Sequence, residues 1–228
     1  MKFGTVGKPC FISGFDLTSV WDAAIRTIWT SGERVVDQRG NTTREILNMV
    51  VHISGTTNDY PERCPCSKIY GDDFADGLIN DIYAYEKASA FDYSYGDRIR
   101  IDNALYNAIE TLRNDPTTRT GVLTIYQNSD TKRAVARSRG ERDAKEVPCA
   151  TQCYLIIRDG KLHVDLMMRS NDYLMAMPSD VFGFRALQAF VADELNVKIG
   201  SYTHFVMSSH IIEENGKDFM ERYMRGVL

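Results

Sequence analysis

Long apolar runs are missing from this sequence, and so is the basic segment followed by an apolar one that marks a secretory signal. Neither sign of charge is in large excess, because the formal net charge is -4 and the two signs are interspersed. A charge balance of this kind attracts neither nucleic acid polymers nor anionic lipid. We therefore expect a protein whose partners include no membrane and no polymeric nucleic acid.

Cysteine and histidine are also scarce. The five cysteines are odd in number and lack the spacing of a disulfide framework, which favours a reducing compartment. Cys64 and Cys66 flank a proline, but the four histidines supply no further ligands at metal-binding spacing, so we expect no metal. Apolar residues, in contrast, make up 43% of the 228 residues, enough for a full core. We expect residues 1–228 to form one domain.

The most informative stretch lies between residues 147 and 182. It opens with Pro148-Cys149 and continues with two β-rich runs, 153–158 and 161–170. Asp159-Gly160 joins the runs, and this dipeptide favours a tight type I′ hairpin turn. In the second run alternate positions are aliphatic, namely Leu162, Val164, Leu166 and Met168.

Arg169 belongs to the other set of alternating positions. The pattern therefore places its guanidinium on the sheet face opposite the aliphatic stripe. Downstream, Pro178-Ser179-Asp180 leads into an apolar-periodic helix, and either Ser179 or Asp180 would suit as its N-cap. Elsewhere, periodicity predicts helices at 18–29, 78–91 and 101–112, strands at 45–53, 122–126 and 201–212, and a solvated linker or basic tether at 129–146.

These motifs resemble the thymidylate synthase superfamily. That family has a proline-cysteine nucleophile, a D-G-K-L turn, an R-S-x-D motif and a P-x-N before a long central helix. Here the same order holds, with Pro148-Cys149, Asp159-Gly160-Lys161-Leu162, Arg169-Ser170-Asn171-Asp172 and Pro178-Ser179-Asp180. Asp180 replaces the asparagine, and this exchange, like the R-S-N-D wording, resembles the phage deoxycytidylate hydroxymethylases.

The resemblance implies an α/β fold with a large mixed sheet, packed by helices that include a long central one. It also implies a homodimer formed through the sheet, a pyrimidine nucleoside monophosphate as substrate and 5,10-methylenetetrahydrofolate as co-substrate. The expected location is the cytoplasm of a producing cell or of a phage-infected host.

The resemblance assigns the phosphate to arginines from both subunits. Arg169 and Ser170 would bind it within one subunit, while Arg119 would reach it from the other. Thr120 replaces the second arginine of that family pair. In the loop at 35–43 Gln38 stands nearest the family's phosphate arginine. Arg39 and Arg44 are its possible substitutes, or simply solvated charges.

Three further positions take roles that the resemblance implies. Asp81 falls at the catalytic glutamate position in the helix expected at 78–91, with Glu86 as its rival. Tyr95 would frame the pyrimidine pocket. His210 would bind the sugar 3′-hydroxyl, although Ile212 replaces the tyrosine of that family motif.

The chemistry explains why these groups belong together. Carbon 5 of a pyrimidine is a weak nucleophile until a thiolate adds at carbon 6, and Cys149 would supply that thiolate. Arg169 would favour the anionic thiol and would also bind phosphate. Asp180 would select cytosine, because a buried neutral carboxyl offers one acceptor for the N4 amino group and one donor for N3.

The fate of the one-carbon unit depends on water. The exocyclic methylene can accept water, giving hydroxymethyl, or a hydride from the folate, giving methyl. Phe91 to Ser94 replace the shielding tryptophan segment of the synthases, and no closing tail is evident, which favours water ordered by Asp172. We therefore expect a dCMP or CMP hydroxymethylase. A dCMP or dUMP methylase and a catalytically silent nucleotide-binding relative are the alternatives.

Overall fold

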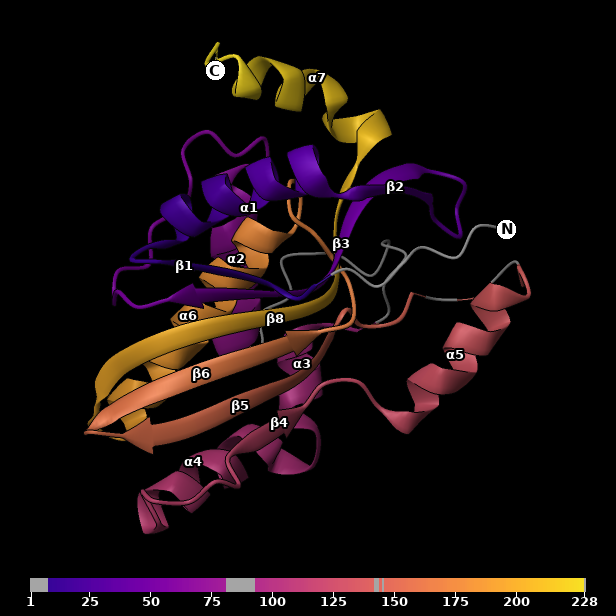
Figure 1. The fold of residues 1–228 in the computed structure, drawn as a ribbon. Helices are drawn as coiled ribbons and strands as arrows, with labels where there is room; N and C mark the ends of the chain where they lie inside the picture. Colours follow the sequence, from indigo (N-terminus) through magenta and orange to yellow (C-terminus); the bar gives the residue numbers. More distant parts are fainter. Residues whose placement is uncertain (1–7, 81–92, 142–143, 145, 228) are drawn as a thin grey trace.

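The computed structural model describes residues 8–80, 93–141, 144 and 146–227. A large mixed sheet forms its centre, and helices cover one of the two sheet faces (Figure 1). The strands are β1 (Cys10–Gly14), β2 (Glu33–Val36), β3 (Thr42–Ile53), β4 (Val122–Thr124), β5 (Ala150–Arg158), β6 (Lys161–Met168), β7 (Asn171–Asp172) and β8 (Lys198–Ile212). The helices are α1 (Leu17–Ser31), α2 (Lys68–Asn80), α3 (Tyr95–Arg100), α4 (Ala104–Asn114), α5 (Asn128–Ser138), α6 (Met177–Glu194) and α7 (Glu213–Met224), with a 3-10 turn at Ile101–Asn103.

The sheet mixes parallel and antiparallel pairs. Its order is β1-β3-β8-β6-β5-β4, with β2 added to β3 and β7 added to β8. The pairs β1–β3, β6–β8 and β7–β8 are parallel, and the remaining pairs are antiparallel. The expected α/β fold with a large mixed sheet is confirmed.

Strands β5 and β6 form the predicted hairpin. Asp159 and Gly160 have φ values of 51° and 68°, as a type I′ turn requires at both central positions. The aliphatic stripe of β6 faces the core, since Leu162 and Leu166 are fully buried. β6 ends at Met168, so Arg169 follows the strand instead of lying within it, and β5 begins at Ala150, directly after Cys149.

Helix α6 is the long central helix. Its apolar positions Val181, Phe184, Leu187 and Val191 have no exposed surface. α2 packs against it closely, because a Cβ atom added at Gly183 would stand 2.1 Å from Phe74. The predicted cap is wrong, however. Ala176 is the N-cap residue, and Asp180 lies buried within the first turn.

Two other expectations about local structure need correction. The segment expected as linker at 129–146 contains α5, which begins with a capping box between Gln127 and Asp130. Helix α2 occupies 68–80, ten residues before the start expected at 78, and the rest of the expected helix lies outside the described residues. No helix within the described parts of the chain is long and apolar enough to cross a membrane.

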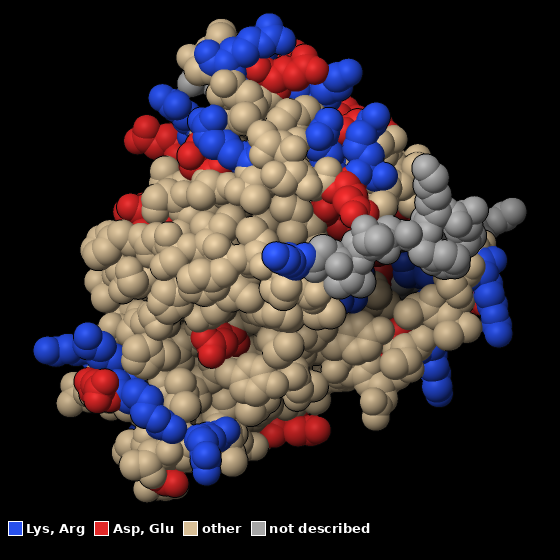
Figure 2. All heavy atoms as spheres, in the orientation of Figure 1, with Lys and Arg blue, Asp and Glu red and all other residues tan. Residues whose placement is uncertain are grey.

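No helix of the described residues covers the second face of the sheet where β8, β6 and β5 are seen in Figure 1. Figure 2 looks onto this face and shows a broad field of uncharged atoms with most charged side chains around its margin. Phe11 of β1 and Met207 of β8 are 68% and 48% exposed. Such an extended uncharged surface is typical of a protein interface.

Candidate active site

Cys149 lies at the start of β5, packed against the core and only partly exposed. Arg169 holds the segment that carries it. The Nε and Nη2 atoms of Arg169 donate to the carbonyl oxygens of Pro148 and Val147 at 2.9 and 3.0 Å, and its backbone N–H donates to the Cys149 carbonyl at 2.8 Å. Burial raises the pKa of the Cys149 thiol, while the Arg169 guanidinium opposes that rise. The structure thus brings the predicted nucleophile and the predicted guanidinium together.

Two tyrosines line the site beside Cys149. The phenol oxygen of Tyr95 accepts from the backbone N–H of Ala150 at 3.2 Å. Tyr93 lies next to it, with ring centroids 6.1 Å apart and planes 31° apart, and the guanidinium of Arg98 covers the Tyr93 ring. This aromatic wall, Tyr93 and Tyr95, gives the site a flat apolar side against which a planar ring can pack.

Asp180 is a buried acid. Burial raises its pKa to about 7, and a hydrogen bond from Asn171 opposes the rise. The Nδ2 atom of Asn171 donates to Asp180 Oδ2 at 3.1 Å. The negative form of Asp180 would also raise the pKa of Cys149, which shows that the two groups share one electrostatic environment. A carboxyl of this kind can be neutral near pH 7 and then offers both a donor and an acceptor.

A chain of neutral polar groups continues from Asp180 into the core. Asn171 Nδ2 also lies 3.1 Å from His204 Nε2, and His204 Nδ1 lies 3.2 Å from the Tyr202 hydroxyl. Burial lowers the pKa of His204 to about 3, so the ring is neutral at physiological pH and its Nε2 accepts from the amide. Asn171 is therefore the residue that fixes the carboxyl of Asp180.

Asp172 and His210 face each other in the pairing of β7 with β8. The Oδ1 atom of Asp172 accepts from the backbone N–H groups of Leu174 and Met175 at 2.9 and 3.1 Å. Burial raises the pKa of Asp172, and the charge of His210 opposes this. His210 Nδ1 lies 3.4 Å from the carbonyl oxygen of Ser208.

Arg39 and Arg44, the two possible substitutes for the family's phosphate-binding arginine, lie in different surroundings. Arg39 forms an ion pair with Glu146 at 2.7 Å, three residues before Cys149, and Arg137 of α5 reaches the same carboxylate at 2.9 Å. Arg44 instead pairs with Glu213 at 2.8 Å and stacks on Trp29. Of the two, Arg39 is among the charged groups that oppose the rise in the pKa of Cys149.

Comparisons with known proteins show the family of this chain. The family description "Thymidylate synthase" matches residues 65–226. A protein of Methanococcoides burtonii named "Putative thymidylate synthase" is 30% identical over 218 residues, which cover 92% of this chain and 93% of that protein. Another of Methanosarcina acetivorans, with the same name, is 28% identical over 218 residues and 93% of each chain. This chain belongs to the thymidylate synthase family.

A solved structure supports the same fold. The thermostable thymidylate synthase A from Bacillus subtilis superposes with a TM-score of 0.67 at 17% identity, over 91% of this chain and 83% of that one. Thymidylate synthase-like proteins are one-carbon transferases that use methylenetetrahydrofolate, bind a nucleotide and are typically dimeric.

Within the thymidylate synthase fold, the remaining predicted residues divide into three groups. Ser170 lies partly buried between Arg169 and the start of β7. Arg119 is exposed near the opposite end of the β5–β6 hairpin from Cys149. Asp81 and its rival Glu86 lie outside the described residues.

Sequence reasoning missed two buried groups of this site. His204 had no motif to mark it, although its burial on alternate positions of β8 beside Tyr202 was a possible signal. The ion pair between Arg98 and Asp130, bidentate at 2.9 Å and buried, joins α3 behind the aromatic wall to α5. Among the described residues, no cluster of three or more His, Cys, Asp or Glu side chains is placed to hold a metal ion.

Proposed function

We propose that this chain is a folate-dependent 5-hydroxymethyltransferase of dCMP or CMP, formed by residues 1–228 as one catalytic domain. The substrates are the nucleotide, 5,10-methylenetetrahydrofolate and water, and the products are the 5-hydroxymethyl nucleotide and tetrahydrofolate. The observation that supports this choice most directly is Asp180, a buried carboxyl with a pKa raised to about 7 where the family has an asparagine amide.

The reaction begins at Cys149. Its sulfur forms a bond to carbon 6 of the pyrimidine, and the electron pair of the 5,6 double bond makes carbon 5 nucleophilic. Arg169 favours the thiolate by its charge and fixes the backbone on both sides of the Pro148-Cys149 bond. The folate donor supplies a methylene group that carbon 5 captures. Carbon 5 then loses its proton, and the bond from the methylene to the folate nitrogen breaks, which releases tetrahydrofolate and leaves an exocyclic methylene on carbon 5.

Asp180 selects cytosine. In its neutral form one oxygen accepts from the N4 amino group and the other donates its proton to N3. Asn171 donates a hydrogen bond to the carboxyl, so the side chain of Asp180 is oriented before the base binds. Tyr93 and Tyr95 supply the flat surface beside the reacting thiol, which suits the base or the ring system of the folate.

The last step adds water to the exocyclic methylene at carbon 5. The water oxygen bonds to that carbon, one proton leaves the water, and the electron pair returns to the ring as the Cys149 sulfur departs from carbon 6. Asp172 is the group that would order this water, because Oδ1 accepts the two backbone N–H groups while no donor within the described parts of the chain reaches Oδ2. His210, paired with it across the strands, would bind the sugar hydroxyl.

The phosphate is assigned to Arg169 and Ser170, with Arg39 as a further cation near Cys149. Arg119 would serve the site of a second subunit. The uncharged sheet face with Phe11 and Met207 is the surface through which two copies would pair, since burying it removes apolar area from water.

A second candidate is a C5 methylase of dCMP or dUMP, and the name of the relatives, "Putative thymidylate synthase", favours a methylated product. One experiment separates the two. The purified protein is incubated with methylenetetrahydrofolate and with dCMP, CMP or dUMP in turn, and the nucleotide products are identified by mass spectrometry. A hydroxymethylated cytidine nucleotide supports the proposal, whereas a methylated product or turnover of dUMP alone would overturn it.

A further inference from the structure

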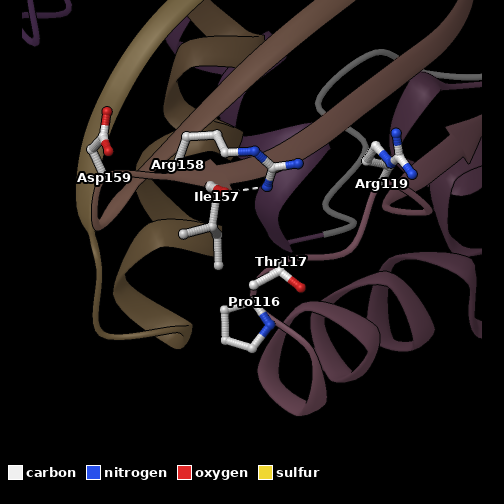
Figure 3. Close-up of a pocket in the computed structure, with 6 residues that line it drawn as sticks. All are labelled: Pro116, Thr117, Arg119, Ile157, Arg158 and Asp159. Atoms are coloured by element: carbon white, nitrogen blue, oxygen red, sulfur yellow. Dashed lines mark hydrogen bonds between the residues drawn. The ribbon is translucent and has the colours of Figure 1, made fainter.

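A hollow of about 530 Å³ lies at the turn end of the β5–β6 hairpin. Two guanidinium groups, those of Arg119 and Arg158, lie among the residues that line it (Figure 3). The antiparallel register of β4 and β5 explains why they are neighbours. Val122 pairs with Tyr154, so continuing the same register places Arg119 opposite Ile157, next to Arg158. In Figure 3 the Arg158 side chain extends toward Arg119.

Both guanidiniums retain free donors. Arg119 forms no hydrogen bond or ion pair with any residue in the described part of the chain. Arg158 donates one N–H to the carbonyl oxygen of its neighbour Ile157 at 2.5 Å. Asp159 also lines the hollow, and in Figure 3 its carboxylate is directed away from the two arginines. Two planar cations at one opening are suited to an oxyanion with several acceptor oxygens, such as a phosphate monoester.

The hollow is too far from Cys149 of its own chain to share a nucleotide with it. Cys149 precedes the first residue of β5 and Arg158 is the last. With a rise of about 3.3 Å per residue, a strand of this length separates the two ends by roughly 26 Å. A nucleotide bound at Cys149 can therefore meet these arginines only if they come from another subunit.

We propose that Arg158, together with Arg119, binds the 5′-phosphate of the nucleotide held at Cys149 of a second copy of this chain. The inference rests on the proposed function, which includes the homodimer. When two sheets pack face to face, the two-fold axis lies in the plane between them. If that axis runs across the strands, it brings the hairpin turn of one subunit to the Cys149 end of the other. Arg158 is then the second guanidinium of the shared phosphate site.

The first test compares affinities for CMP and for cytidine, which lacks the phosphate. Arg158→Ala should weaken CMP binding about ten- to a hundredfold, as expected for a charge-assisted hydrogen bond, and leave cytidine binding unchanged. Asp159→Asn should strengthen CMP binding a few-fold, because it removes a negative charge while Asn tolerates the positive φ of 51°. Lys161→Ala is the matched control, an exposed cation in the same hairpin that does not line the hollow.

The second test uses mixed dimers of Arg158→Ala and Arg169→Ala subunits. If Arg158 acts across the interface, one of the two sites contains both native arginines, and half of the parent activity returns with the parent KM for the nucleotide. If no activity returns, or if Arg158→Ala changes CMP and cytidine binding equally, the proposal is refuted. Loss of CMP affinity in Arg119→Ala but not in Arg158→Ala would refute the role of Arg158 and leave the proposed function standing. Failure of the parent protein to bind CMP would refute both.

Discussion

Replacing Asp180 with asparagine should move the preference of the protein from a cytidine to a uridine nucleotide. Asp180 is 9% exposed, and among the residues that the structure describes Asn171 is the one side chain that donates to it, at 3.1 Å. In the variant, the amide can donate to O4 of uracil and accept from its N3–H, whereas against cytosine both contacts are mismatched. Each unmatched polar contact in a dry site costs about 1–3 kcal/mol.

Two such contacts together cost about 2–6 kcal/mol, which is about thirtyfold to roughly twenty-five thousandfold in the ratio of specificity constants. The assay is direct competition between dCMP and dUMP, measured on the parent and on Asp180→Asn, with release of the carbon 5 hydrogen as the readout. Asn171→Ala serves as a matched variant, because it loosens residue 180 without changing its chemical type. An unchanged preference for dCMP over dUMP in Asp180→Asn would show that Asp180 is only a buried structural acid. The assignment of cytosine as the substrate base would then be wrong.

The other predictions concern protonation, the nucleophile and the dimer. Because burial raises the pKa of Asp180 to about 7 and the neutral form is the one that pairs with cytosine, CMP affinity should fall about tenfold per pH unit above that value. In Asp180→Asn this dependence should disappear in calorimetric titrations, and its persistence would assign the proton to another group. Cys149→Ala should abolish both turnover and exchange of the carbon 5 hydrogen while nucleotide still binds, so continued exchange would remove Cys149 from its role. Arg119→Ala should weaken nucleotide binding by about 1.5–3 kcal/mol, and a mixed dimer with Arg169→Ala should regain one intact site; a monomer that turns over at full rate would contradict this.

Local patterns predicted the centre of the fold well. The type I′ turn at Asp159-Gly160 depends only on two residues that accept positive φ, and the burial of alternate positions of β6 follows from the period of a strand. The apolar spacing of α6 likewise needs no knowledge of its partners. These properties depend on residues that are close together in the chain, so they can be predicted from the sequence.

The errors came from interactions between distant parts of the chain. Residues 129–138 read as linker because they are strongly polar, yet α5 forms there, with its capping acid Asp130 buried against Arg98. Ser179 and Asp180 both suit an N-cap by type, but α6 begins earlier, with Pro178 in its first turn, and so Asp180 is buried inside the helix.

In the site, too, local motifs could be predicted and contacts between distant residues could not. The motif around Arg169 indicated that an arginine would lie beside Cys149, since the hairpin fixes both. The contact of Asn171 with His204 could not be predicted, because it depends on β7 and β8 pairing in one particular register across 33 residues of chain. Similarly, Arg119 and Arg158 line the same hollow only because β4 pairs with β5.

The central claim is that water, and not a hydride, completes the reaction on a cytosine nucleotide. The most direct measurement is to run the reaction with dCMP or CMP and methylenetetrahydrofolate in isotopically labelled water, and to determine the mass of the product after digestion to the nucleoside. The account predicts a 5-hydroxymethyl product that contains one labelled oxygen, together with tetrahydrofolate. A 5-methyl product without label, formed together with dihydrofolate, would contradict it.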